Sequence, residues 1–395
     1  MHDMNAAEAA ALAYVWGLPL VTMHRTRVRH RADPGLARRD RLSTAVDRDV
    51  VAPNNDTLYA SGWFDLGDGD VWIDVPPTDG RYWSVMLLDA YTHVQYVSRR
   101  THGSAGARVR VTFDPAATSS GDVVAIGTRT LWALSRVVVH GPGDLQAARA
   151  LQAGIGVRHT ADAAVGRRTP TEIRPVPFGS FVDELAAAVA VDPPGATHAA
   201  MPAAVGALLD DPPSAAAVAD GIEEGRRRIA AAHGGADRSV NGWGTRVRGA
   251  DFGDDIVYRA AFAATSLGGH LPVENRSYSR VVDGARPTVL RLGPDTTPPV
   301  RGFWSLTVYG PDLFFVPNRI DRYSIGDRTP GLVRSADGGL EIELAADVQG
   351  PVANWLPTPS GPYVLSLRAY EGAPEVVDAS WFPPDLCPRP RSAPA

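Results

Sequence analysis

Two stretches of the chain alternate between apolar and polar residues with a period of two, and a third stretch between them does not. In the first stretch, six short runs bounded by Gly, Pro, Asn or Asp have the alternation expected of β-strands. These runs are residues 57–66, 71–76, 82–91, 107–113, 122–128 and 130–140. Strands at this spacing, with turn residues between them, predict an antiparallel sandwich or jelly roll.

Helical spacing marks the other parts of the chain. Alanine-rich runs at 181–191, 196–211, 215–235 and 254–269 predict helices, and a further helix is predicted at 144–152. An N-terminal helix is expected to be capped by Asn5 with Glu8 in a capping box, its apolar run ending at Gly17 and Pro19. Strands resume at 288–293, 302–310, 340–346 and 363–370.

This order predicts an α+β, mainly β fold of two β-sandwich (jelly-roll-like) domains joined by a helical middle region. We expect an N-terminal helix plus first sandwich at 1–165, a helical region at 166–270 and a second sandwich at 271–395. The run Tyr82-Trp83-Ser84 is matched by Phe303-Trp304-Ser305, 221 residues later. The two sandwiches are therefore expected to be related halves.

The net charge and hydrophobic content of the chain limit the kinds of partner that we expect. A net charge of −5 and 44% hydrophobic residues are those of an ordinary soluble protein, so we expect neither nucleic acid nor a membrane as a partner, and leave open a homo-oligomer. The acidic start of the N-terminal helix does not resemble a secretory signal, and no run reaches 18 uninterrupted apolar residues, so a cytoplasmic location without a transmembrane helix is expected. The arginine, alanine and glycine bias is typical of a GC-rich, actinobacterial-like genome.

Several classes of chemistry are excluded or disfavoured. The chain has no lysine, so all 39 basic residues are arginines, and Schiff-base, pyridoxal phosphate and P-loop chemistry are excluded. Its single cysteine, Cys387, lies in a Pro-rich tail and permits no intrachain disulfide. No G-x-S-x-G or G-x-G-x-x-G motif is present. The ten histidines form no dense pair, His93 and His102 being the nearest to one, so we predict no metal and no organic cofactor, with a spatially assembled histidine site left open.

Seven motifs, in order, resemble one tandem bacterial family, that of domains of unknown function 1254 and 1214, over roughly residues 14–383. They are Asn54-Asn55-Asp56-Thr57-Leu58-Tyr59, Arg81-Tyr82-Trp83-Ser84 with Asp89-Ala90-Tyr91-Thr92, Asn241-Gly242-Trp243, Tyr258 with Arg259-Ala260, Phe303-Trp304-Ser305-Leu306-Thr307, Pro317-Asn318 with Arg322-Tyr323-Ser324, and Asn354-Trp355-Leu356-Pro357 with Arg368-Ala369-Tyr370. The resemblance implies two β-sandwich units joined through helices. Many members resemble exported proteins, from which this chain is expected to differ.

The motifs also supply the candidate site. We take the catalytic candidates to be Asp56, Tyr59, Asp89 and Tyr323. The substrate-binding candidates are Asn54, Tyr91, Arg99, Trp304, Asn318, Arg322, Asn354, Trp355 and Arg368. Each has a structural alternative: Asn54 to Asp56 can form an Asx turn, Asp89 can pair with Arg99 or Arg100, and both tryptophans can belong to the core.

Three kinds of function fit these residues. The favoured one is a cofactor-independent enzyme, a lyase, isomerase or hydrolase of specialised metabolism, acting on a carboxylate- or polyol-bearing small molecule. Asp and Tyr would move a proton, and Arg would hold the anion. The alternatives are a non-catalytic small-ligand or carbohydrate-binding protein, and a scaffold for a protein partner. If the polar motifs of both halves share one site, it should lie at the domain junction.

Overall fold

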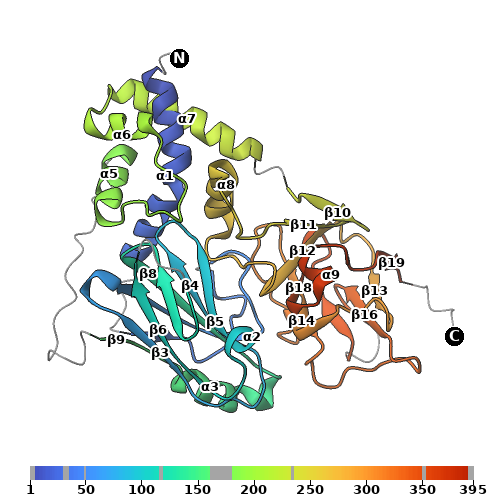
Figure 1. Cartoon of the computed structure of the whole chain (residues 1–395). Coiled ribbons are helices and arrows are strands. Elements are labelled where there is room, and N and C mark those ends of the chain that lie inside the picture. Colours follow the sequence, from blue (N-terminus) through green and yellow to red (C-terminus); the bar gives the residue numbers. More distant parts are fainter. Residues whose placement is uncertain are drawn as a thin grey trace.

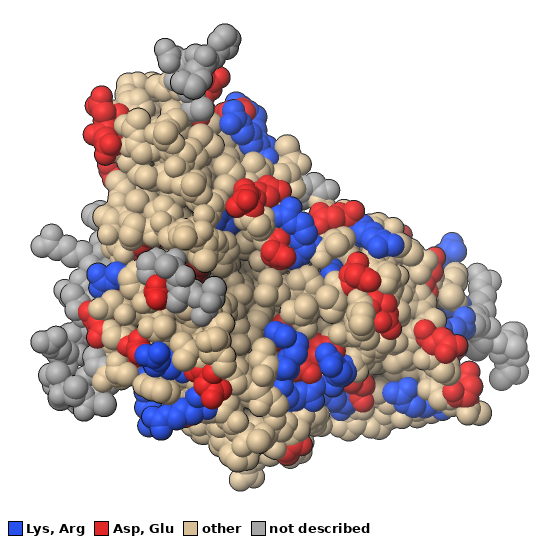
Figure 2. All heavy atoms as spheres, viewed as in Figure 1, with Lys and Arg blue, Asp and Glu red and all other residues tan. Residues whose placement is uncertain are grey.

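The computed structural model describes residues 5–29, 35–48, 50–114, 119–160, 180–232, 235–348 and 353–389. It has a mainly β, α+β fold with two β-rich domains, and a unit of helices lies against both (Figure 1). The expected domain limit at 165 lies outside the described residues. On the face that Figure 2 shows, basic and acidic residues are mixed in small groups rather than gathered by sign.

The helical unit is built around α1 (Ala6–Arg29). Helices α5 (Phe181–Val191), α6 (Ala203–Asp210), α7 (Ala215–Ala232) and α8 (Ile256–Ser266) all contact it. The predicted capping box is present: Glu8 N donates to Asn5 Oδ1 at 2.9 Å, and Asn5 N donates to Glu8 Oε2 at 3.1 Å. In space, α1 therefore belongs with the middle helices rather than with the first sandwich.

The predicted end of α1 at Gly17 and Pro19 is wrong, because the helix continues to Arg29. Trp16 and Leu20 are fully buried in the helical unit, and this packing outweighs the local cost of a proline. By length and composition α1 is the one candidate membrane span among the described residues. In the structure, 61% of its most apolar window is buried inside the protein.

The first β-rich domain consists of two sheets packed face to face. One sheet has the order β1-β2-β8-β4-β5 and the other β7-β6-β3-β9. The strands are β1 (Ala37–Arg38), β2 (Thr57–Asp65), β3 (Val71–Val75), β4 (Trp83–Asp89), β5 (Val94–Ser98), β6 (Ala107–Phe113), β7 (Val123–Ile126), β8 (Thr130–Val138) and β9 (Gly156–His159). Short helix α2 (Arg99–His102) follows β5, and α3 (Leu145–Gly154) follows β8. The 3-10 turn η1 (Leu66–Asp68) follows β2, and η2 (Pro142–Asp144) precedes α3. One apolar core lies between the sheets.

The second β-rich domain is also a pair of sheets, with the orders β10-β11-β12-β18-β14-β15 and β17-β16-β13-β19. The strands are β10 (Arg238–Val240), β11 (Trp243–Thr245), β12 (Asn275–Val282), β13 (Thr288–Leu292), β14 (Val300–Tyr309), β15 (Ser324–Gly326), β16 (Leu340–Ala345), β17 (Trp355–Pro357), β18 (Tyr363–Gly372) and β19 (Leu386–Pro388), and α9 (Pro374–Val377) follows β18. Cys387 thus lies in a paired strand, not in a ragged tail. Phe315 lies in the loop after β14, where its ring stacks between those of Tyr309 and Tyr323.

The two domains repeat one topology. The strands from β2 to β9 pair in the same order as the strands from β12 to β19. The purely antiparallel pattern expected from the sequence is wrong at one equivalent place in each domain, where β6 pairs with β7 and β16 pairs with β17 in parallel. Trp83 faces Val137 on β8, and Trp304 faces Ala369 on β18. Trp83 and Trp304 therefore hold equivalent register positions, each in the core of its own half.

Helix α7 approaches α1 so closely that Gly221 has no room for a side chain. A Cβ at Gly221 would lie 2.4 Å from Ala10 Cβ and 2.5 Å from Ala7 O, whereas at Gly206 in α6 it would meet only Met201 Cε at 3.6 Å. We expect Gly221→Ala to lower the free energy of unfolding by about 1–3 kcal/mol.

The matched Gly206→Ala variant should be neutral or stabilise by up to about 1 kcal/mol, because alanine favours the helix. Urea unfolding followed by circular dichroism measures both. Equal stability of the two variants would show that α1 and α7 are not packed this closely.

Candidate functional site

The two β-rich domains contact each other through the same face of equivalent sheets. Tyr82, Val138, Phe303 and Tyr370 form a fully buried cluster at the centre of this junction, and the Tyr82 and Phe303 ring centroids are 5.4 Å apart. Tyr82 lies opposite Val138 on β8, and Phe303 lies opposite Tyr370 on β18. The junction thus has the self-complementary form of a two-fold dimer interface within one chain.

Two ion pairs cross the junction in reciprocal positions. Asp56, just before β2, lies 3.1 Å from Arg328 of the second domain. Glu274, just before β12, lies 2.9 Å from Arg100 of the first domain. Arg100 and Arg328 each stand two residues after β5 and β15. We call these two pairs the reciprocal clamps.

Both clamp carboxylates are also held by hydroxyl groups. Ser305 Oγ donates to Asp56 Oδ2 at 2.6 Å, so both oxygens of Asp56 have partners. Tyr82 Oη donates to Glu274 Oε1 at 2.9 Å, and burial raises the pKa of Glu274 against the opposing effect of Arg100. The contacts of Asp56 are those of an interdomain clamp.

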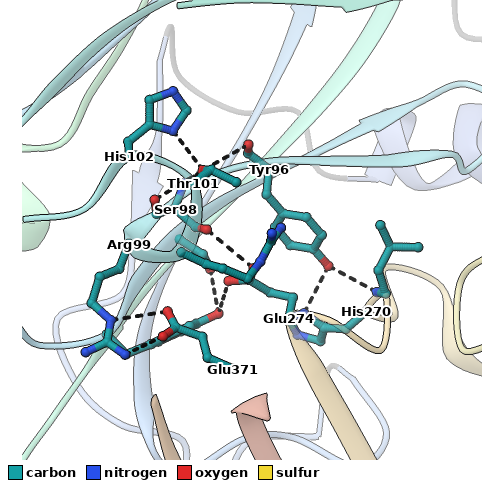
Figure 3. A network of polar contacts seen from close by, with 12 residues as sticks. Tyr96, Ser98, Arg99, Thr101, His102, His270, Glu274 and Glu371 are labelled. Carbon is teal, nitrogen blue, oxygen red and sulfur yellow. Dashed lines mark hydrogen bonds and ion pairs between the residues drawn. The ribbon is translucent and has the colours of Figure 1, made fainter. Parts of the chain in front are cut away.

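Figure 3 shows the surroundings of Glu274, where β5 and α2 of the first domain meet the second. Arg99 forms an ion pair with Glu371 and donates to the backbone oxygen of Arg301 at 2.7 Å. The predicted pairing of Asp89 with Arg99 or Arg100 is therefore wrong, because each arginine holds a carboxylate of the second domain instead.

Two further arginines, Arg136 and Arg368, lie buried in the same interface. They are equivalent by register, since Arg136 faces Ser84 and Arg368 faces Ser305. Arg136 is 4% exposed and Arg368 8% exposed, yet neither forms an ion pair with any described residue. Burying a charge without a counter-ion is costly, so these two arginines are the most unusual groups of the junction.

The partners of the two arginines are neutral. Arg368 donates to Thr307 Oγ1 at 3.3 Å and to the oxygen of Ala52 at 3.0 Å, and its guanidinium lies 5.6 Å from the Tyr309 ring centroid. Arg136 lies 5.1 Å from the centroid of the half-buried Tyr59, and its buried Nε has no hydrogen-bond partner among the described residues.

The guanidinium groups of Arg136 and Arg368 both lower the pKa of His270. Burial, then Arg136, then Arg368 hold the pKa of His270 well below its ordinary value. His270 Nδ1 lies 3.1 Å from Tyr96 Oη. A neutral histidine, two arginines and the phenols of Tyr59 and Tyr370 meet here, and the clamp carboxylates of Asp56 and Glu274 already have arginine partners of their own.

A second polar cluster lies where β4 ends beneath the helical unit. Asp89 Oδ1 accepts from the backbone N–H groups of Tyr91 and His93, and its Oδ2 lies 2.8 Å from His198 Nε2 and 3.3 Å from His93 Nδ1. Burial raises the pKa of Asp89, but the two histidines outweigh it and hold that pKa well below the ordinary range. Thr92 adopts a left-handed φ of 69°, which folds the turn so that Asp89 and His93 meet.

Asp89, His93 and His198 offer ligand atoms within 4.8 Å of one another, the spacing of a metal site. The hydrogen bonds of His198 do not fit those of a metal ligand. Gly195 N donates to His198 Nδ1 at 2.8 Å, so in a neutral imidazole the proton must sit on Nε2, which then donates to Asp89. Metal-binding histidines show the reverse polarity, with the second nitrogen donating.

Next to this cluster, Arg259 of α8 is 1% exposed, and none of its three side-chain nitrogens has a hydrogen-bond partner among the described residues. Its guanidinium lies 5.8 Å from the Tyr91 ring centroid. Burial lowers the pKa of Arg259, and Asp89 opposes that shift. A cavity of about 10 Å³, room for one water, lies nearby between Thr92 and Phe262.

The other predicted residues are distributed over separate places. Asn54 Oδ1 accepts from the N–H groups of Asp56 and Thr57, which confirms the Asx turn, and its Nδ2 donates to Tyr370 Oη. Tyr91 Oη donates to the oxygen of Asp192. Trp304 is buried in the second core, as its structural alternative predicted.

Most side chains of the 318–323 and 354–355 motifs bind within the second domain, and Tyr323 also packs against Ala45 and Ala52 of the first. Asn318 holds the backbone of Arg322, whose Nη1 donates to the oxygens of Ala353 and Trp355 at 3.1 and 2.8 Å. Trp355 is buried and donates to Ala345, Asn354 bonds Val333, and Tyr323 donates to Asp321. Asp56, Tyr59, Asn54 and Arg368 meet at the junction, whereas Arg322 lies in backbone contacts elsewhere.

Sequence reasoning missed most of the groups now found at these places. They are Arg100, Arg136, His198, Arg259, His270, Glu274 and Arg328. One signal was available for Arg136, which interrupts an otherwise apolar strand. Arg100 was considered only as a partner of Asp89, and Arg259 only as part of a family motif, while no pattern pointed to the rest.

The clamps predict a large effect of removing one partner. Arg328→Met leaves Asp56 buried without its counter-ion, so we expect the free energy of unfolding to fall by about 3–5 kcal/mol. Removing Arg291, half-exposed beside the exposed Glu341, should cost less than about 1 kcal/mol. Chemical denaturation measures both, and similar losses would contradict the clamp.

The histidine tautomer predicts that the Asp89 cluster does not hold zinc. We expect protein purified without chelators to carry less than one equivalent of any transition metal, measured by elemental analysis. A calorimetric zinc titration should give the same result for the protein and for the His198→Asn variant. One equivalent of metal that is lost in that variant would overturn the assignment.

Comparison with known proteins supports the division into two halves. Residues 36–159 match the family described as "Protein of unknown function (DUF1254)", and residues 274–374 match "Protein of unknown function (DUF1214)". No curated protein matches the chain.

Two solved structures share the fold. The VPA0106 protein from Vibrio parahaemolyticus is 19% identical, with a TM-score of 0.73 over 98% of this chain and 100% of its own. An uncharacterized protein from Burkholderia cenocepacia is 15% identical, with a TM-score of 0.51 over 95% of this chain and 87% of its own. With its two matched segments in the predicted order, the chain belongs to the tandem DUF1254/DUF1214 family.

Proposed function

We propose that the protein is a cofactor-independent enzyme that acts on a carboxylate-bearing small molecule at the domain junction. Arg136 and Arg368 hold the anion, and Tyr59 moves a proton. The observation that carries this proposal is the burial of two arginines at equivalent positions of one interface without an ion pair among the described residues.

The energetics of the junction support an anion there. Other buried charges of the interface have counter-ions: Asp56 has Arg328, and Glu274 has Arg100. Arg136 and Arg368 instead have neutral hydroxyl, sulfur, carbonyl and ring neighbours. A ligand carboxylate would supply the missing charge, and guanidinium groups bind carboxylates through two parallel hydrogen bonds.

Tyr59 is the group placed to transfer a proton. It is half-buried, while Leu58 and Ala60 beside it are fully buried, so its ring stands between the interface and solvent. Arg136 lies over this ring. Tyr59 therefore stands beside an arginine proposed to hold the anion, where its hydroxyl group would transfer a proton in a lyase, isomerase or hydrolase reaction on a hydroxy or keto acid.

A non-catalytic binding protein is the second candidate. The parallel stack of Trp63 and Trp132, with ring centroids 4.8 Å apart, lies on the same sheet face as Arg136. Trp132 is buried in an apolar cluster and Trp63 is half-buried, so Trp63 is the ring of this pair that a sugar or flat ligand would meet.

The buried arginine predicts opposite effects on stability and binding. In Arg136→Met, a charge without a counter-ion becomes apolar, so the Tm should stay equal or rise while stabilisation by 10 mM malate, tartrate or gluconate disappears. Differential scanning fluorimetry measures both. The control Arg108→Met, at an exposed arginine, should change neither.

If Arg136→Met instead unfolds while its folded fraction still binds the acids, Arg136 is structural and the proposal fails. Tyr59→Phe separates the two candidate functions. An enzyme should lose at least about 100-fold in turnover with its affinity retained. A binding protein should show no turnover in either form.

We further propose a cytoplasmic location and a role in specialised metabolism. The first rests on α1 being packed inside the helical unit. Cell fractionation tests it, and recovery of the protein in a membrane or extracellular fraction would contradict it.

A further inference from the structure

The segment between α8 and β12 brings a histidine side chain into the interdomain junction. His270 is half-buried, and its ring centroid lies 5.9 Å from that of Tyr370, with the two rings at 80°. Figure 3 shows the His270 ring beside Tyr96 of β5. Because Arg136 and Arg368 both lower the pKa of His270, this ring lies close to the two groups proposed to hold the anion.

Tyr96 fixes which ring nitrogen of His270 carries the proton. Tyr96 Oη accepts from Leu271 N at 3.3 Å and lies 3.1 Å from His270 Nδ1. Oη has no other hydrogen-bond partner among the described residues, so its own proton goes to Nδ1, and the proton of the neutral imidazole is on Nε2. Nε2 forms no hydrogen bond with a described residue, which leaves a donor without an acceptor.

The other half of the protein builds the corresponding place without an imidazole. His270 lies four residues before the clamp carboxylate Glu274, and Ala52 lies four residues before the clamp carboxylate Asp56. Ala52 offers only its backbone oxygen to Arg368, at 3.0 Å. Packing of the junction therefore does not account for a histidine here.

The groups around Arg136 favour a ligand atom that accepts hydrogen bonds. Arg136 Nε is buried without an acceptor among the described residues, and the carboxylates of Asp56 and Glu274 are held in the clamps. A keto oxygen only accepts hydrogen bonds. An ammonium group only donates them and would lie beside two guanidinium charges, which repel it.

We infer that His270 is a further substrate-binding residue of the junction, where Nε2–H donates to the keto oxygen of a 2-oxo acid whose carboxylate is held by Arg136 and Arg368. This inference rests on the proposed function. Tyr96 is a positioning residue, because it acts on the substrate only through the tautomer of His270. The substrate enters beside Tyr59 and His270, both of which are half-buried.

Four acids with the same carbon chain test this choice of substrate on the full chain. 2-Oxobutanoate, 2-hydroxybutanoate, 2-aminobutanoate and butanoate differ only in the group on the carbon next to the carboxylate. Isothermal titration calorimetry should show that 2-oxobutanoate binds about tenfold more tightly than butanoate, because it gains one hydrogen bond from a buried donor. 2-Aminobutanoate should bind more weakly than butanoate, and 2-hydroxybutanoate between butanoate and 2-oxobutanoate.

Matched histidine variants locate the donor. His270→Phe keeps an aromatic ring but removes the N–H group, so it should abolish the tenfold preference for 2-oxobutanoate and leave the affinity for butanoate unchanged. His102→Phe is the control, because His102 is a half-buried histidine of α2 whose ring is hydrogen-bonded to Thr101. His102→Phe should change neither affinity. Thermal melts check that both variants fold.

A tyrosine pair tests the role of the tautomer without changing His270. Nitrogen-15 NMR should show the His270 proton on Nε2 in the protein, and a mixture of both tautomers in Tyr96→Phe. The preference for 2-oxobutanoate should fall together with the Nε2–H form. Tyr278→Phe, which removes a buried hydroxyl group without a partner among the described residues, should alter neither the tautomer nor the preference.

The outcomes separate this inference from the function on which it rests. If the acids bind in an Arg136-dependent way without a preference for 2-oxobutanoate, or His270→Phe acts like His102→Phe, the role of His270 is wrong and the proposed function stands. If His270→Phe does not fold, Tyr96→Phe decides: a changed tautomer with an unchanged preference overturns the inference. A proton on Nδ1 in the unaltered protein also overturns it. If none of the acids requires Arg136, the proposed function itself fails.

Discussion

The arrangement of the molecule depends on the packing of two equivalent sheet faces against each other. Because the halves share one topology, the residues that protrude from one face meet their own equivalents: Tyr82 meets Phe303, and the pair Asp56–Arg328 is matched by Glu274–Arg100. In a self-complementary interface, a contact that is specified once in the repeated unit is formed at two places in the structure. Fusion of two copies keeps that advantage and allows each copy to change alone.

The same symmetry explains how the junction can contain two buried arginines that have no counter-ion among the described residues. The two reciprocal clamps satisfy their carboxylates with both an arginine and a hydroxyl group, so they stabilise the junction. Arg136 and Arg368 sit between them and oppose folding, because their charges are desolvated without a counter-ion among the described residues.

Sequence patterns predicted the strands and helices well because each has a period of its own, and the motif Tyr82-Trp83-Ser84 even predicted the duplication. They failed where long-range packing decides. Helix α1 passes through Gly17 and Pro19 because its neighbours bury it, and Asp89 binds His198, 109 residues away, rather than the nearby Arg99. Asp56 and Arg368 both lie at the junction, whereas Arg322 donates to backbone oxygens of its own domain and the neighbouring Ser324 donates to Asn55 of the first domain. A polar residue in a motif indicates that its identity matters, but it does not indicate whether the residue serves packing, an interface or a ligand.

Divergence between the two halves is the most direct guide to where chemistry can occur. Positions that stayed alike, such as Ser84 and Ser305 beside their arginines, serve the interface that both halves share. Positions that differ reflect other contacts: Tyr59 corresponds to the exposed Ser277, whereas Trp63, which packs against a cluster that includes Phe262 of α8, corresponds to the exposed Val281. Both halves have a buried arginine at the equivalent position, but only the first half places a tyrosine opposite it on the neighbouring strand. Under the proposed function, the two halves would therefore share the binding of the anion, whereas proton transfer would depend on Tyr59 of the first half alone.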